Sequence, residues 1–531
     1  MNESEILFSS KKTIFWAIGL FLIQIIAITG LSFYVITDND IYYPHRLVSS
    51  LEYLDYFYDG DINRTELIQQ ARTAIFEELD RYSGYIEPNL MGMVTEEFTG
   101  AYSGIGITVI PTESGLSIMS VREEGPAGQA GIQTGDVIIR VDSTDLGEGV
   151  SYSALSLLRG EEGSPVKIMV YRYGLADTLE FELIRKKLDL IHIPYAGITD
   201  NHNLYIRLAD FEAGLTYQLQ DVIDTLFEPN RGSINGIVLD LRGNPGGLLG
   251  EAIASADLFL DKDHLIVGTK GRSKWADRTF YSSGEDITDG LPMVILVDRG
   301  SASSAEILSG ALRYANRAVL VGDTTYGKGL VQQYSGFSDG SGMRLTTSRY
   351  YFEGGTFLNN PESKIIDSAA GLAPDYYIKS IASNKFPREL ENSLLLREFA
   401  LQNADQITMF KPMSNNAEQL FYKFIEFTHD NGFEYKSDMT ELAGLTKDVV
   451  QFGNYDHKTL QAIDKIYKLA INSDQTAFEE YKDYIKTRLF QIALEIKVGL
   501  PESYRSAIIP FRTEIILAEK IIADNPKMSH E

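Results

Sequence analysis

Residues 294–308 read V-I-L-V-D-R-G-S-A-S-S-A-E-I-L, so an apolar run passes through a turn of small residues into a second apolar pattern. Residues 293–297 predict a buried strand, and the spacing after the turn predicts a helix. Two further apolar strands are predicted at residues 236–241 and 318–321. Because strands and helices alternate over residues 195–380, this part of the chain is predicted to form an α/β layer.

Ser303 lies at the entry to the predicted helix. Ser303 and Glu306 match a capping box, in which the serine hydroxyl satisfies a backbone N–H and the glutamate reaches back. The same position suits a nucleophile, because a helix start offers unpaired N–H groups and the positive end of the helix dipole to an oxyanion. Both interpretations are open from this stretch alone.

Residues 324–332, T-T-Y-G-K-G-L-V-Q, follow one of the predicted strands and place Lys328 between two glycines. Small neighbours let the lysine backbone approach a site closely, which a surface charge does not need. Burial lowers the pKa of a lysine, so that its free amine can take a proton from serine, as in known Ser–Lys variants of the catalytic triad. Gln332 either orients this amine or is a polar strand residue facing solvent.

A second glycine turn occurs at residues 239–247, L-D-L-R-G-N-P-G-G, after a predicted buried strand. Its exposed N–H groups at Gly246 and Gly247, together with the N–H of Ser304, can form an oxyanion hole. The alternative is a plain strand-to-helix turn, in which Asp240 and Arg242 hold the turn and take no part in catalysis.

Residues 95–190 contain short strands and the stretch G-P-A-x-x-A-G-I-x-x-G-D-V-I at residues 125–138. This order of elements resembles a PDZ domain. In such a domain a loop of backbone N–H groups captures a terminal carboxylate while the peptide pairs with the adjacent strand. The residues predicted to do so here are Gly104, Ile105, Gly106 and Ile107.

The flanking regions carry no recognisable site chemistry. Residues 42–92 predict helices that form a packed collar or a dimer contact, and residues 384–531 predict a helical domain. Residues 13–35 lack charges and follow Lys11 and Lys12. They predict a transmembrane anchor rather than a cleaved signal peptide, with residues 1–12 in the cytoplasm and the catalytic part outside it, periplasmic in a Gram-negative cell.

Composition excludes several classes of function. The chain has 531 residues, too many for one domain, a net charge of −26 and no cysteine. An acidic surface repels phosphate backbones, and the absence of cysteine excludes disulfides and a thiol nucleophile. None of the seven histidines has the spacing of a metal site or of a hydrolase motif. The sequence therefore predicts no nucleic-acid partner, no metal and no cofactor.

Over residues 42–380 these motifs together resemble the carboxyl-terminal processing peptidases, also called tail-specific proteases. The resemblance rests on the PDZ stretch, D-L-R-x-N-P-G-G, G-S-A-S-x-x-E-I and T-x-G-K-G-x-V-Q, in that order, and on G-L-A-P-D at residues 371–375. It implies that Ser303 is the nucleophile, Lys328 the base and Gln332 its support. The family commonly reads S-A-S-A-S-E, whereas Ser304 and Ala305 are exchanged here.

The resemblance also implies a multidomain α/β fold, with a crotonase-like α/β peptidase core, an inserted β-rich PDZ domain, N-terminal helices and a C-terminal all-α domain. The expected activity is that of a serine endopeptidase that cuts polypeptides with accessible C-terminal tails near those tails, possibly as a homo-oligomer. The PDZ domain is expected to bind tails and to gate the site. Arg159, at the end of the PDZ helix, is the expected sensor of the bound state; alternatively, it is a solvated arginine at a helix end. The alternatives in function are a non-catalytic PDZ adaptor and an esterase on a crotonase-like core.

Overall fold

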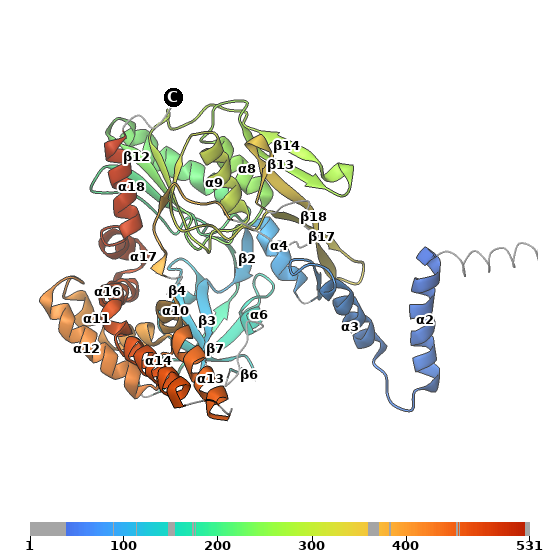
Figure 1. Ribbon diagram of the computed structural model, residues 1–531. Coiled ribbons are helices and arrows are strands. Elements are labelled where there is room, and N and C mark those ends of the chain that lie inside the picture. The colour runs from blue at the N-terminus through green and yellow to red at the C-terminus, as the bar shows by residue number, and fades with distance from the viewer. Residues whose placement is uncertain are drawn as a thin grey trace, which may run out of the picture. The chain divides into compact units, whose positions relative to one another are not determined.

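The computed structural model of the protein describes residues 39–88, 90–112, 114–146, 154–172, 175, 177–358, 371–381, 384–452, 455 and 457–525 (Figure 1). The chain divides into two compact units, residues 1–85 and 86–531. The first contains α2 (Asn39–Phe57) and α3 (Arg64–Glu77), and β1 (Gly84–Ile86) spans the boundary. Asn63 caps α3 by accepting a hydrogen bond from the N–H of Glu66. Whether these helices form a collar or a dimer contact stays a prediction.

The predicted localisation needs correction. Among the residues that the structure describes, no helix is long and apolar enough to cross a bilayer. The 19-residue helix α2, for example, carries Arg46, Glu52 and Asp55, and a spanning helix tolerates few such charges. The prediction of a single-pass membrane protein with an extracytoplasmic catalytic part conflicts with this finding and is withdrawn. The anchor and cytoplasmic segment predicted at residues 13–35 and 1–12 lie outside the described residues.

The second unit begins with a β-rich part. Its main sheet has the strand order β3–β4–β5–β7–β8 and is antiparallel throughout, with β6 paired to β5, while β2 pairs with β9. Alternate apolar side chains of these strands, such as Leu116, Ile118 and Ile138, form one buried cluster. The elements are α4 (Met91–Thr99), β2 (Ala101–Gly104), β3 (Ile107–Thr112), β4 (Gly115–Val121), α5 (Pro126–Gln129), β5 (Val137–Val141), β6 (Thr144–Asp145), α6 (Leu155–Leu158), β7 (Pro165–Tyr171), β8 (Leu179–Ile184) and β9 (Lys186–Asp189).

A mostly parallel sheet follows, with the order β10–β11–β12–β15–β16–β20, in which only the β10–β11 pair is antiparallel. All five residues of β12 and of β15 are buried, because both faces of the sheet are covered by other elements. The elements of this layer are β10 (Tyr195–Ile198), β11 (Asn203–Arg207), α7 (Leu215–Val222), the π-turn Ile223–Phe227, the 3₁₀ turn Glu228–Ser233, β12 (Gly236–Asp240), α8 (Leu249–Asp257), β15 (Met293–Val297), α9 (Ser304–Tyr314), β16 (Val319–Gly322) and β20 (Tyr376–Tyr377).

Two groups of helices cover this sheet. Leu204, Ile237 and Leu239 share a buried cluster with apolar residues of α7, α8 and α9, whereas Tyr205 and Val238 share another with α18 (Thr513–Asp524). Neighbouring residues of one strand therefore point to opposite faces. The helix α18 lies along the parallel sheet, far from α9 in sequence (Figure 1). The peptidase layer is thus completed by a helix that the apolar pattern assigned to the C-terminal helical domain.

A second, antiparallel sheet supplies the other side of the site. In it β18 (Gly342–Phe352) pairs with β13 (Leu265–Gly271), β17 (Leu330–Gly336) and β19 (Thr356–Phe357), and β13 also pairs with β14 (Arg278–Tyr281). The 3₁₀ turns Lys274–Ala276 and Glu353–Gly355 complete it. The register of β17 shifts between Val331 and Gln332. Such an irregularity changes where the side chains beside it point.

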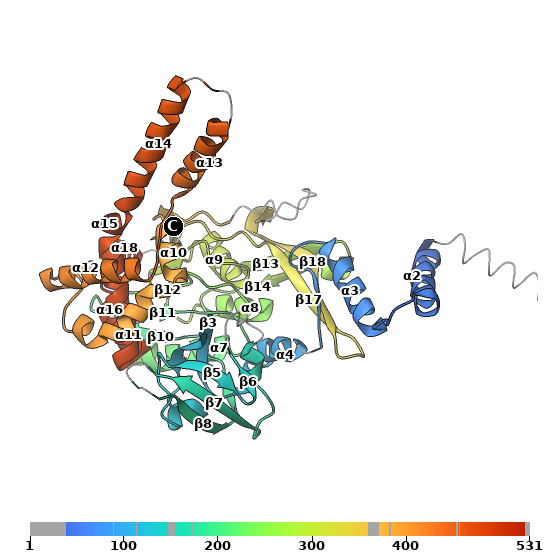
Figure 2. The ribbon, with the colours of Figure 1, turned by 90° about the horizontal axis from the view of Figure 1, so that it is seen from below.

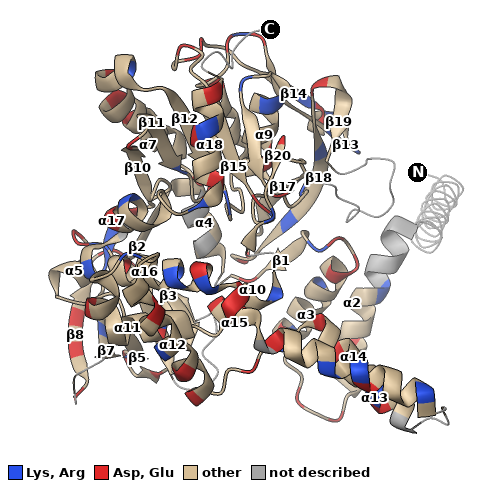
Figure 3. Ribbon diagram, turned by 60° about the vertical axis from the view of Figure 1, so that its left-hand side comes forward, with Lys and Arg blue, Asp and Glu red and all other residues tan. Residues whose placement is uncertain are grey.

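The C-terminal helices pack mainly on one another, with α11 against α16 and a core that includes Phe386, Phe399 and Phe424. Figure 2 shows α13 and α14 extending from this group as an antiparallel pair. On these two helices acidic and basic residues are interspersed (Figure 3). The elements are α10 (Lys385–Asn392), α11 (Leu395–Thr408), α12 (Asn415–Asp430), α13 (Asp438–Phe452), α14 (His457–Gln475), α15 (Ala477–Glu480), α16 (Lys482–Val498), α17 (Leu500–Ser503) and the π-turn Tyr504–Ile508.

Candidate active site

Ser303 occupies a constrained turn between β15 and α9. Its φ and ψ are 55° and −116°, a conformation that residues other than glycine rarely adopt. A strained strand-to-helix turn of this kind is where hydrolases commonly present a nucleophilic serine. Ser303 and Glu306 have the arrangement of a capping box, yet the serine hydroxyl makes no cap hydrogen bond of standard geometry. The glutamate half of the box is formed, since Glu306 Oε2 accepts from the Ser303 N–H at 2.9 Å.

Glu306 joins the serine turn to the lysine loop. It is fully buried, and its carboxylate accepts four hydrogen bonds, from the N–H groups of Ser303, Gly327 and Lys328 at 2.9, 2.6 and 2.9 Å and from the Thr325 hydroxyl at 2.5 Å. Burial raises the pKa of the Glu306 carboxyl above its usual value, against these hydrogen bonds, which lower it. The sequence predicted Glu306 only as a partner in a capping box. In the structure its carboxylate also binds the main chain of Lys328, so that Ser303 and Lys328 are held by the same side chain.

Lys328 lies in the loop between β16 and β17 and is partly buried. The loop is tied to the serine turn a second time, because the N–H of Tyr326 donates to the carbonyl of Ser301 at 2.9 Å. Gln332 lies on β17 beside the register shift, and its Nε2 donates to Thr346 Oγ1 at 3.4 Å. The structure thus brings the loops of Ser303 and Lys328 together and puts Gln332 on the strand that leaves the lysine loop.

The glycine turn contacts the serine directly. A Cβ on Gly246 would meet Ser303 Cβ at 2.7 Å and Ser304 N at 2.8 Å, so only glycine fits there. The Gly246 N–H is already taken by Asn244 Oδ1 at 2.9 Å. Within the described part of the chain, the N–H groups of Gly247 and Ser304 have no hydrogen-bond acceptor. These are the two donors in the turn that are available to an oxyanion.

Asn244 and Asp240 fix this turn from below the surface. Asn244 is fully buried, and its backbone carbonyl oxygen accepts a hydrogen bond from the Ala302 N–H at 2.9 Å. The sequence did not predict this contact. Asp240 makes a two-pronged pair with Arg242, at 3.0 and 2.7 Å, and Arg242 also pairs with Glu514 of α18 at 3.1 Å. Burial raises the pKa of the Asp240 carboxyl, but the charges of Arg242 and Arg207 outweigh it and hold that pKa below its usual range.

The predicted carboxylate loop lies at one edge of the β-rich part. Gly104 ends β2, Ile107 begins β3, and the N–H groups of Ile105 and Gly106 between them have no acceptor in the described residues. Strand β3 is the last of its sheet and pairs only with β4 among the described strands. Its outer edge can therefore accept an added strand.

Arg159 follows α6 and lies over the ring of Tyr102, 5.6 Å from its centroid. Burial lowers the pKa of the Arg159 guanidinium, and the charge of Glu212 acts in the opposite sense. Glu212 belongs to the segment after β11, next to Phe211, whose N–H donates to the Gly246 carbonyl at 2.9 Å. The charge of Glu212 therefore acts on Arg159 from a peptidase-layer segment that also contacts the glycine turn, and a sensing role for Arg159 stays a prediction.

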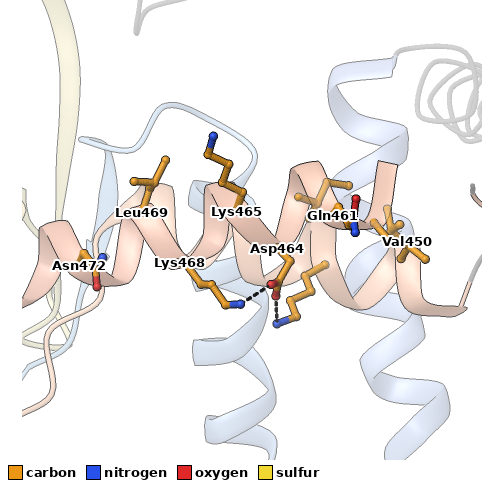
Figure 4. A pocket seen from close by; sticks show the side chains of 10 residues that line it. Val450, Gln461, Asp464, Lys465, Lys468, Leu469 and Asn472 are labelled. Carbon is orange, nitrogen blue, oxygen red and sulfur yellow. Dashed lines mark hydrogen bonds and ion pairs between the residues drawn. The ribbon is translucent and has the colours of Figure 1, made fainter. Parts of the chain in front are cut away.

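A cavity of about 540 Å³ between α13 and α14 lies apart from these residues (Figure 4). Asp464 on its wall pairs with Lys447 and Lys468 at 2.8 and 2.7 Å, and their hydrogen bonds lower the pKa of Asp464 to about 2. The Lys447 pair links α13 to α14, whereas the Lys468 pair lies within α14. Among the residues that can be described, no cluster of histidine and acidic side chains is placed to hold a metal ion.

Comparison with known proteins identifies the family. The model of peptidase family S41 matches residues 202–378, and that of the PDZ domain matches residues 103–183. The carboxyl-terminal-processing protease of Synechocystis sp. is 34% identical over 293 residues, 53% of this chain and 67% of that protein. Carboxy-terminal processing protease CtpA of Bacillus subtilis is 30% identical over 324 residues, 61% and 67% of the two chains. The corresponding protease of Bartonella bacilliformis is 29% identical over 378 residues, 71% and 84%.

Among solved structures, the photosystem II D1 C-terminal processing protease is 27% identical and covers 61% of this chain and 84% of its own, with a TM-score of 0.38. This chain belongs to the carboxy-terminal processing proteases of peptidase family S41 and carries a PDZ domain. The predicted resemblance is confirmed, whereas a crotonase-like core stays a prediction.

Proposed function

We propose that the chain is a serine endopeptidase that cuts polypeptides near their C-termini, with Ser303 as nucleophile and Lys328 as general base. The observation that carries the proposal is the buried Glu306 carboxylate, which holds the N–H groups of both residues within 2.9 Å of one oxygen. A helix cap would require only the hydrogen bond between Glu306 and the Ser303 N–H. The further hydrogen bond from Lys328 to the same carboxylate is not explained by capping. Gln332 supports the lysine from β17.

In the proposed reaction, the neutral Lys328 amine takes the proton of Ser303 Oγ as that oxygen attacks the scissile carbonyl. The N–H groups of Gly247 and Ser304 stabilise the oxyanion, since that of Gly246 is committed to Asn244. The protonated amine then gives its proton to the departing nitrogen, and the C–N bond breaks to leave an acyl-enzyme. Water, deprotonated by the same amine, hydrolyses the ester and restores Ser303.

Substrate tails dock on the PDZ domain in this proposal. The terminal carboxylate accepts from the N–H groups of Ile105 and Gly106 in the loop Gly104–Ile107, and the tail pairs with the open edge of β3. The support is that neither N–H has an acceptor among the residues that the structure describes, and that β3 ends its sheet. The charge of Glu212 acts on Arg159. In this proposal Arg159 couples the binding of a tail by the PDZ domain to the peptidase layer.

The test is digestion of a disordered protein by the full chain, with the fragments mapped by intact mass. The parent is expected to cut near the free C-terminus, and amidation of that terminus is expected to slow cutting. Ser303→Ala is expected to be inactive. Ser309→Ala is the matched control, because Ser309 is buried on α9, the helix that follows Ser303, and its hydroxyl donates to the Ala305 carbonyl within that helix. Tail binding without cutting by the parent would favour the PDZ adaptor, and cutting by Ser303→Ala would exclude Ser303 as nucleophile.

A further inference from the structure

A buried tyrosine contacts the main chain of both proposed catalytic residues. Tyr350, on β18, has no exposed surface, and its ring packs edge-on against Phe352 with the centroids 5.8 Å apart. Its hydroxyl donates to the carbonyl oxygen of Lys328 at 2.7 Å and lies 3.4 Å from the carbonyl oxygen of Ser303. Its backbone N–H donates to the carbonyl of Gly329 at 3.1 Å. The ring itself is held by core packing, so the hydroxyl has a defined position.

Tyr350 complements what Glu306 does. The carboxylate of Glu306 holds the N–H groups of Ser303 and Lys328, and the hydroxyl of Tyr350 lies against their carbonyl oxygens. The lysine needs this second contact, because Gly327 has a φ of 90° and two glycines flank the residue. Glycine places little restriction on the rotation of an adjacent peptide. The shorter hydrogen bond therefore fixes the peptide group that carries Lys328.

We infer that Tyr350 is a positioning residue for the Ser303–Lys328 pair, and that its hydroxyl holds the lysine main chain where proton transfer from the serine is possible. The inference rests on the proposed function, since it needs a Ser–Lys reaction to position. Tyr350 acts through the backbone and neither exchanges a proton nor touches the substrate. Burial of a hydroxyl at this point is explained by the two carbonyl oxygens that it serves.

The test removes one oxygen atom. Tyr350→Phe keeps the ring and its packing, and Tyr351→Phe is the matched control, because successive side chains of a strand point to opposite faces and Tyr351 packs on Phe357 instead. Two quantities are measured on the full chain, the rate at which a fluorophosphonate labels Ser303 and the kcat and KM for a tail-bearing peptide. Labelling reports on the Ser303–Lys328 pair without cleavage of a substrate, and it is measured with the same tail peptide present for every variant.

For Tyr350→Phe, labelling and kcat are expected to fall about 10- to 100-fold with KM unchanged, as a small misplacement of reacting groups does. Tyr351→Phe is expected to keep parental rates. Labelling is compared per folded molecule, well below each melting temperature, so that loss of stability does not count. If Tyr350→Phe melts near the assay temperature, a second variant is used in which 3-fluorotyrosine replaces Tyr350 and no other tyrosine. It keeps the hydroxyl but alters its hydrogen bond, so the labelling rate is expected to differ from that of the parent.

A parental labelling rate in Tyr350→Phe, or in the 3-fluorotyrosine protein, would overturn the inference. So would an equal loss in Tyr351→Phe, which would indicate a general effect of the sheet. A raised KM with unchanged kcat would also overturn it, because the hydroxyl would then act in substrate binding. Failure of the parent itself to be labelled at Ser303 would instead contradict the proposed function, which keeps the two failures distinguishable.

Discussion

Exchanging one oxygen of Glu306 for nitrogen separates its structural role from its role in the site. In Glu306→Gln the amide carbonyl is expected to replace Oε1, which accepts the two shorter hydrogen bonds, from the Thr325 hydroxyl and the Gly327 N–H. The new NH₂ group then faces the N–H groups of Ser303 and Lys328, which both bond to Oε2 at 2.9 Å in the parent. Donors meet donors, so the two lost hydrogen bonds are those of Ser303 and Lys328, the proposed catalytic pair.

Hydrogen bonds to a charged group contribute about 1.5–3 kcal/mol each, so the loss of two destabilises by about 3–6 kcal/mol. Removal of a buried charge offsets part of this, and we expect a net loss near the lower end, about 3 kcal/mol. For a domain of this size that corresponds to a fall of about 6–12 °C in Tm. Labelling of Ser303 per folded molecule is expected to fall about 100-fold, because both proposed catalytic residues lose a hydrogen bond that holds their main chain.

Glu251→Gln is the matched control for the calorimetry and the labelling. The Glu251 carboxylate accepts from the Gly214 N–H at 3.0 Å and from the N–H and hydroxyl of Thr216 at 2.9 and 2.5 Å, in the same layer but outside the site. The Glu251→Gln variant is expected to have a lower Tm than the parent and the same rate of Ser303 labelling per folded molecule. Parental labelling by Glu306→Gln, or an equal loss of labelling in Glu251→Gln, would refute the role assigned to the carboxylate.

Three further predictions concern the base, the tail and one histidine. If the neutral amine of Lys328 is the base, as proposed, activity is expected to rise with pH and then level off. Lys328→Arg is expected to be inactive, because guanidinium stays protonated, and a pH–rate profile that falls through neutrality contradicts the proposal. A tail peptide supplied in trans is expected to raise turnover of a short reporter peptide by the parent but not by Arg159→Ala. Equal turnover by both proteins, with and without the tail peptide, would show that the PDZ domain only recruits substrate. Burial lowers the pKa of His192, but the hydrogen bond from its Nδ1 to Asp210 at 2.6 Å and the charge of that carboxylate outweigh it and raise the pKa above 6.5. The stability from this pair is present below pH 6.5 and lost as pH rises through the raised pKa, so thermal unfolding of Asp210→Asn is expected to lack that decline, and an unchanged decline would exclude the pair as its source.

Local patterns predicted the elements of the site because their determinants are local. The apolar run before Ser303 forms β15, and the apolar spacing after it forms α9. The glycine at 246 follows from a close approach that a Cβ would block, a requirement that one residue can carry in sequence. The turn, the lysine loop and the PDZ elements were therefore identified from the sequence.

Contacts between distant segments were not predictable in this way. A capping box explains why Glu306 follows Ser303 by three residues, but nothing in that spacing reveals a lysine loop on the same carboxylate. The apolar face of residues 513–524 shows that the helix is buried, not that it is buried on the parallel sheet. The buried Arg397 of α11 likewise donates to the carbonyl of Met119 at 2.8 Å, which ties the C-terminal helices to β4 by a contact 278 residues apart in sequence.

The position of α18 has a consequence for synthesis of the protein. Until the ribosome has released residues 513–524, one face of the parallel sheet, with Val238, Val294 and Tyr205, lacks the helix that packs on it, and Arg242 lacks Glu514 as its partner. The nascent chain can therefore form its PDZ domain while the peptidase layer is still incomplete. The turn that carries Arg242 and Gly247 is therefore completed late, after the PDZ domain and most of the peptidase layer have been synthesised.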